Sequence, residues 1–184
     1  MNIFAFSNDP YTAAKLLDDR RVNKMLLESV QIISTVCHEA GYPIIPLTKA
    51  GTPYKPTHQN HPAVKWAGES SGNLNWLCKY TWWLGFHFNL RFGREHSCSK
   101  AFNDWWAESV ANKENGYGTG GLWNTIPAGH RTDFVQCMPD EYKGHDATSA
   151  YKRYFWGEKV DESTRWFKTN FNGDIPSVWG TYLA

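Results

Sequence analysis

Apolar residues recur at three- and four-residue intervals in several segments of the chain, which is the spacing of one buried helix face. The clearest run begins at Val22 and includes Met25, Val30 and Ile33, and Gly41 marks its expected end. Ahead of it, Ser7-Asn8-Asp9-Pro10 is typical of a helix start, which predicts a short helix over residues 11–18.

Further helical segments alternate with loops in the rest of the chain. They are a proline-rich ordered loop at 42–62, a helical stretch at 63–96 broken near 70–72, a helix at 97–112, a flexible glycine-containing loop at 115–121, a helix at 146–157 capped by Asp146, and an aromatic tail from Thr164 that wraps back over the domain. The pattern therefore predicts an all-α protein, with residues 1–184 in a single compact helical domain with long ordered loops.

Length and composition narrow the class of protein. A chain of 184 residues with 41% apolar content can bury a core without a metal or a disulfide. The four cysteines form no Cys-x-x-Cys pair, which indicates reduced thiols. The start of the chain has no secretory signal, and no apolar run is long enough to cross a membrane. We therefore expect a cytoplasmic protein, in the host cytoplasm if it is viral, with no membrane partner.

Charge and aromatic content bear on possible ligands. The net charge of +1 gives no support to wholesale binding of a polyanion, although a local basic patch would suffice. The ten tryptophans have two interpretations. They form a tryptophan-rich core, or some of them, such as Trp66, line a groove and stack on bases or on another ligand.

The first polar cluster lies at the start of the strongest predicted helix. Arg21, Lys24 and Glu28 share one helix face, which is either a solvated face with an ordinary Lys–Glu pair or a binding face. Asp18 and Asp19 fall at a junction of two helices, directly before Arg20 and Arg21. Such a junction can place a carboxylate in a cleft, where a nearby Arg holds it ionised or grips a phosphate.

The second polar cluster lies in the proline-rich loop, where Thr57, His58, Asn60 and His61 stand close together. The two histidines can order the loop through hydrogen bonds to the backbone, or they can face a substrate. A zinc site needs three or four ligands, and only two are present, so we expect no metal and no other cofactor.

Two further clusters contain basic residues. Arg91 and its basic neighbours are typical of a helix end, or they line an edge that binds phosphate. Tyr151 and Arg153 belong to a segment in which basic residues alternate with tyrosines. That pattern suits contact with a nucleic-acid backbone together with base stacking, and it suits an ordinary amphipathic helix equally well.

The order of several short motifs resembles the pyrimidine-dimer DNA glycosylase/AP lyase family, the phage endonuclease V-like enzymes. The motifs are the start Met1-Asn2-Ile3, Asp18-x-x-Arg21-Val22, Met138-Pro139-Asp140-Glu141-Tyr142-Lys143-Gly144, and Thr164-Arg165-Trp166-Phe167-Lys168. The chain also resembles uncharacterised phage proteins that begin with MNIF and carry a Thr-His-x-Asn-His-Pro loop, as residues 57–62 do here.

The glycosylase resemblance implies an all-helical fold and a specific chemistry. The N-terminal amine of Met1 would attack the sugar C1′ and expel the base, with Asp18 or Asp19 as the assisting acid and strand cleavage by β-elimination. The histidine loop is not part of that family's catalytic scheme, but for a DNA-acting enzyme we expect His58, Asn60 and His61 to handle the base or the leaving group. The expected substrate contacts are Asn2, Arg20, Arg21, Lys24, Glu28, Thr57, Asn60, Trp66, Arg91, Tyr151 and Arg153.

Two other functions fit the same residues. The protein would be an enzyme on a free nucleotide or a small phosphorylated metabolite, which requires a deep, closed pocket in place of an open groove. Alternatively it would be a non-enzymatic binding or host-takeover protein, in which the polar clusters are purely structural. The expected partner is accordingly duplex DNA or a nucleotide.

Overall fold

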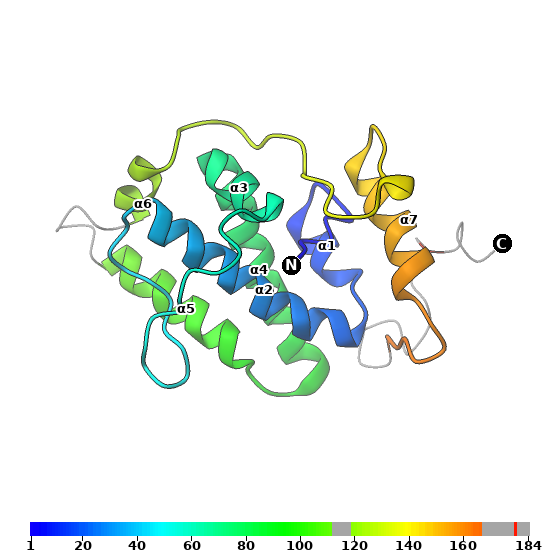
Figure 1. The fold of residues 1–184 in the computed structure, drawn as a ribbon. Helices are drawn as coiled ribbons and strands as arrows, with labels where there is room; N and C mark the ends of the chain where they lie inside the picture. The colour runs from blue at the N-terminus through cyan, green and yellow to red at the C-terminus, as the bar shows by residue number, and fades with distance from the viewer. Residues whose placement is uncertain (112–118, 167–178, 180–184) are drawn as a thin grey trace.

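The computed structural model describes residues 1–111, 119–166 and 179. These residues form seven α-helices and one short 3-10 helix without any strand, which confirms the predicted all-α fold (Figure 1). In chain order they are α1 Pro10–Lys15, α2 Asp19–Glu39, α3 Pro62–Glu69, α4 Ser71–Phe92, α5 Ser97–Ala111, α6 Thr119–Thr125, η2 Asp140–Tyr142 and α7 Ala147–Lys159.

Short polar side chains cap the helix starts that the sequence indicates. Asp9 accepts a hydrogen bond from the backbone N–H of Thr12, and Asp146 does the same for the first turn of α7. Ser70 adopts an extended conformation between α3 and α4 and caps α4, so the break expected near residues 70–72 is confirmed. The proline-rich segment is a loop, with an isolated bridge between Leu47 and Pro53.

Some predicted boundaries differ from the structure. The first helix ends at Lys15 and not at residue 18, because Asp18 takes an extended conformation and caps α2. Residues 119–121 of the expected flexible loop belong to α6, whereas residues 112–118 lie outside the described residues. Most of the predicted tail also lies outside them, but Trp179 stacks on Phe155 and is fully buried, as a tail that wraps back requires.

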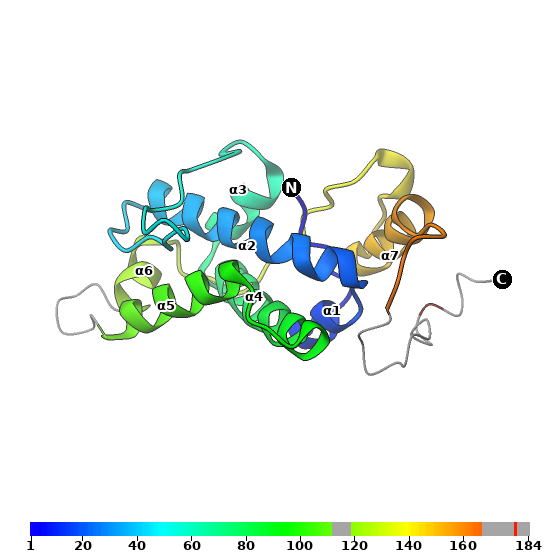
Figure 2. The same ribbon diagram turned by 90° about the horizontal axis from the view of Figure 1, so that it is seen from below.

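Helix α4 is the centre of the packing. It contacts α1, α2, α3 and α5, and Figure 2 shows α2 lying between the N-terminus on one side and α4 and α5 on the other. Most of the buried apolar residues of these helices belong to one hydrophobic cluster. Neither α4 nor any other helix in the described part of the chain is long and apolar enough to cross a lipid bilayer.

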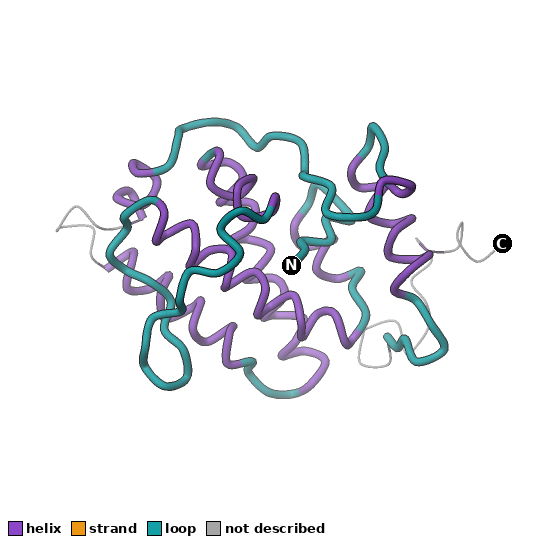
Figure 3. Tube along the Cα trace, in the orientation of Figure 1, coloured by secondary structure: helices purple, strands orange, loops and turns teal. Residues whose placement is uncertain are grey.

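An extended strap over residues 127–139 connects α6 with η2 along one edge of the molecule (Figure 3). Asn73 of α4 binds the strap through the backbone and hydroxyl of Thr132. Phe134 packs its ring against Trp76. The hydroxyl of Tyr151 in α7 donates to the carbonyl of Val135 at 2.7 Å. The strap therefore joins the C-terminal helix to the central one.

Acid sensitivity of the fold is expected from His87 in α4. Burial, followed by the charges of Arg91 and Lys15, lowers the pKa of His87 to about 4. The unfolded chain binds this proton more readily than the folded chain does. The contribution of neutral His87 to the free energy of unfolding is therefore fully present above about pH 6.5 and is lost as the pH falls towards 4. Denaturant unfolding at pH 7 and pH 4.5 should therefore show a smaller loss of stability in His87→Phe than in the parent protein. An equal loss in both proteins would contradict this assignment.

Candidate functional site

The first residues of the chain are fixed beside α2. The backbone N–H of Asn2 donates to Oε2 of Glu28 at 2.7 Å. The Asn2 side chain donates to the carbonyl of Cys137 in the strap at 2.8 Å, and its Oδ1 accepts from the N–H groups of Ile3 and Phe4. Asn2 is thus held between α2 and the strap. Because Met1 directly precedes it, the amino group of the chain lies in the region of Glu28.

The Glu28 carboxylate is unusually placed for an acidic side chain on a helix. Glu28 is only 8% exposed, and Lys24 Nζ lies 3.6 Å from its Oε1 at the solvent rim. The carboxylate lies within electrostatic range of the buried Tyr80 of α4. Burial raises the pKa of the Tyr80 hydroxyl, and the negative charge of Glu28 also raises it. A buried carboxylate is costly without a cationic or hydrogen-bonding partner, and here its partners are Asn2 and Lys24.

The histidine loop is attached to the same helix. Thr35 of α2 accepts a hydrogen bond from the N–H of Thr57 through Oγ1, and this atom lies 3.2 Å from the Thr57 carbonyl. The Thr57 hydroxyl bonds Nδ1 of His58 at 2.7 Å. His58 has a φ of 51°, which is uncommon for a residue other than glycine. Such a conformation persists only where the surroundings impose it, and the turn from His58 to His61 does so here.

His61 connects this loop to α3. It is the N-cap of that helix, and its Nδ1 accepts a hydrogen bond from the N–H of Ala63 at 3.1 Å. Burial lowers the pKa of His61, the charges of the chain's amino group and of His58 lower it further, and Glu28 opposes them. A neutral His61 that accepts at Nδ1 carries its proton on Nε2.

Together these groups form a candidate site of an amino group, a buried carboxylate and a neutral imidazole. The α2 helix supplies Glu28, the strap supplies the carbonyl that positions Asn2, and the loop before α3 supplies His61. Such a set can transfer protons to and from an amine and a bound substrate. In the described residues no three His, Cys, Asp or Glu side chains gather as a metal would require.

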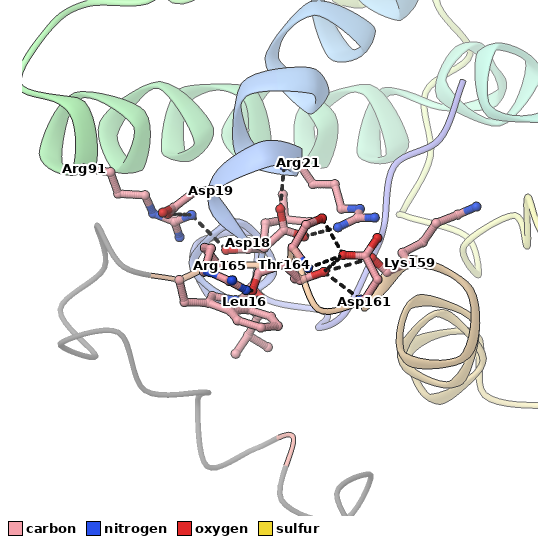
Figure 4. Close-up of polar contacts among 12 residues, drawn as sticks. Leu16, Asp18, Asp19, Arg21, Arg91, Lys159, Asp161, Thr164 and Arg165 are labelled. Atoms are coloured by element: carbon pink, nitrogen blue, oxygen red, sulfur yellow. Dashed lines mark hydrogen bonds and ion pairs between the residues drawn. The ribbon is translucent and has the colours of Figure 1, made fainter.

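Asp18 and Asp19 do not reach this site, and their assignment as the assisting acid is therefore corrected. Asp18 is fully buried, accepts from the backbone N–H of Arg21 and forms a 2.5 Å ion pair with its guanidinium (Figure 4). Asp18 and Glu28 are ten residues apart, which is roughly 15 Å along a helix axis. The rise of the helix along its axis therefore keeps the Asp18 carboxylate away from Glu28.

The basic residues near Asp18 have structural partners. Arg91 has a fully buried guanidinium that donates to the carbonyls of Leu17 and Lys15, with Asp19 Oδ1 3.6 Å away. The backbone of Asp19 in turn donates to the carbonyl of Arg165, so the end of the described C-terminal segment covers this junction (Figure 4). Arg21 and Arg91 thus hold helix ends together, and neither is placed as the phosphate contact that we expected.

The remaining predicted contacts are dispersed. Trp66 is buried in the core and packs against Phe134. Tyr151 is buried and bonds the strap, and Arg153 donates to the carbonyl of Tyr142. The two others are exposed, Arg20 near the start of α2 and Asn60 in the histidine loop. The structure therefore gathers Met1, Asn2, Lys24, Glu28, Thr57, His58 and His61. Asn60 belongs to the same loop with its side chain exposed, and the other predicted contacts lie apart from this group.

The sequence contained one signal for the central role of Glu28. The residue lies three positions after Met25 and four before Ile32, so the helical pattern places this carboxylate on the buried face. Cys137 had no comparable local signal, because its contact with Asn2 joins residues 135 positions apart.

Comparisons of the chain with protein-family models, with curated proteins and with solved structures found no match.

Proposed function

We propose that this protein is a DNA N-glycosylase with AP lyase activity that uses the amino group at the start of the chain as its nucleophile. The observation that carries the proposal is the 2.7 Å hydrogen bond between the backbone nitrogen of Asn2 and the buried carboxylate of Glu28. Because Met1 directly precedes Asn2, this bond supports an amine close to Glu28, and the charges of both groups act on His61. The substrate is duplex DNA, from which the target nucleotide is extruded.

The reaction follows from the chemistry of a positioned amine. Its unprotonated form attacks the sugar C1′, and the bond from C1′ to the base nitrogen breaks. The bond from C1′ to the ring oxygen O4′ then breaks as O4′ takes up a proton lost from the attacking nitrogen, so that the nitrogen and C1′ form an imine. The departing base takes up a proton, which the Nε2–H of His61 can supply. Glu28 stabilises the cationic imine. Removal of a proton from C2′ then expels the 3′ phosphate, which cleaves the strand, and water hydrolyses the imine to release the amine.

Trapping of the imine tests this proposal. The protein incubated with a duplex that contains an abasic site, in the presence of borohydride, should form a covalent adduct because borohydride reduces the imine to a stable amine. Proteolytic mapping should place the DNA on the first residue of the chain. A variant with a short Gly-Ser extension before Met1 is the matched control and should form no adduct at that position. Failure of the parent protein to form an adduct would exclude the imine mechanism.

A further inference from the structure

A long groove lies on the part of the surface formed by α4, α5, α6 and the strap. It consists of two adjoining cavities of about 730 Å³ and about 380 Å³. The two cavities share Asn75 and Lys79 of α4 and Trp106 of α5 as a common wall. No residue of α2 or α3 lines either cavity, so the groove is distinct from the candidate site around Glu28.

The larger cavity has a cationic lining. Lys79, His130 and Arg131 contribute to it, and the described residues that line the two cavities include no Asp or Glu. Arg131 is held in place because its guanidinium donates to Oδ1 of Asn8 at 2.7 Å and lies over the ring of Phe134. A fixed guanidinium and a solvent-exposed ammonium in one acid-free cavity favour an anionic ligand such as a phosphodiester.

The same groove offers aromatic faces. Trp106 and Trp123 are half-buried and line the larger cavity, and Trp106 continues into the smaller one beside Trp82 and Trp83. Trp82 is 50% exposed, which is unusual for so large an apolar side chain. Indole rings that stand at a cation-lined surface can stack on nucleobases, and such stacking tolerates any base because every base has a π-face.

Amide side chains complete the lining. Asn75 lies where the two cavities meet, and Asn103 lines the smaller one. Both can donate to and accept from the polar edges of a base. Beyond Trp82 a third cavity includes Glu95, whose carboxylate marks the end of the acid-free part of the groove.

We propose that this groove binds single-stranded nucleic acid, with bases stacked on Trp82 and Trp106 and phosphates at Lys79 and Arg131. A single strand fits better than a duplex, because stacking on indole rings requires bases that are free of their pairing partners. The shared chemistry is a base that carries a phosphate, so a free nucleotide is the other possible source of the ligand. The inference does not depend on the imine chemistry proposed above.

Fluorescence anisotropy of a fluorescein-labelled oligothymidylate of about eight nucleotides tests the proposal. Trp82→Ala should raise the dissociation constant about tenfold. Leu90→Ala on the same helix is the matched control, since Leu90 is 49% exposed and lines neither cavity, and it should leave the constant unchanged. Lys79→Gln should reduce the slope of log K against log salt by about 0.7, whereas Lys49→Gln in an exposed loop should not.

Competition by thymidine monophosphate separates the two sources of ligand. If thymidine monophosphate displaces the oligonucleotide, and Trp82→Ala and Lys79→Gln weaken its binding as well, the groove is a nucleotide site. If the oligothymidylate binds and the monophosphate does not displace it, the groove binds a strand. Oligonucleotide binding is measured without strand cleavage or adduct formation, so a failure of the imine proposal leaves this one standing. Absence of binding, or binding that neither Trp82→Ala nor Lys79→Gln weakens, would overturn it.

Discussion

Replacement of Glu28 by Gln is expected to slow strand cleavage at an abasic site by at least about a hundredfold, since loss of a positioned acid–base group typically costs that much. The variant should remain folded, because the Gln carbonyl oxygen can still accept the hydrogen bond from the Asn2 backbone. What it loses is the negative charge that stabilises the cationic imine. Single-turnover cleavage of an abasic duplex, with folding checked by circular dichroism, measures the effect.

Two variants make this result specific. Glu39→Gln changes an exposed acid at the end of the same helix and should leave the cleavage rate unchanged. Asp18→Asn retains the N-cap of α2 and should also leave the rate unchanged. A loss of activity in Asp18→Asn, with activity retained in Glu28→Gln, would restore Asp18 as the assisting acid and refute the assignment to Glu28.

Substitution of Arg91 by Met is expected to lower the free energy of unfolding by about 3–5 kcal/mol, more than any other variant proposed for this protein. Such a loss is typical when one partner of a buried ion pair is removed. The guanidinium is 1% exposed, and it satisfies the carbonyls of Leu17 and Lys15 and lies near Asp19. Burial lowers the pKa of Arg91 to about 10, and the charge of Asp19 opposes this effect. Met fills much of the volume but cannot donate, so these oxygens would stay buried without their donor.

Urea unfolding of the Arg91→Met variant measures this loss. Arg94→Met is the matched control, because Arg94 follows closely after α4, is exposed and lies over the ring of Phe88. We expect the control to change the free energy of unfolding by less than about 1 kcal/mol. A small effect of Arg91→Met on stability together with weaker DNA binding would instead support the phosphate-binding role that the sequence suggested.

Much of the secondary structure followed from local rules that the sequence displays directly. The periodic apolar residues from Val22 onwards predicted α2, the segment around Asp9 and the cap Asp146 marked the starts of α1 and α7, and the break near residues 70–72 separated α3 from α4. These features depend on neighbouring residues only, because helix periodicity and capping act over three or four positions. The all-α fold class could therefore be predicted from the chain alone.

The sequence also indicated which residue types carry the chemistry, but it did not assign their partners. Asp18 and Glu28 are both acids beside arginines or lysines in the same helical segment, and local spacing does not tell them apart. Only the folded chain decided between them: Asp18 lies against Arg21 beneath the C-terminal segment, whereas Glu28 meets Asn2, 26 residues away in sequence. Contacts such as Asn2 to Cys137 depend on how distant segments pack together, and no short-range pattern encodes them.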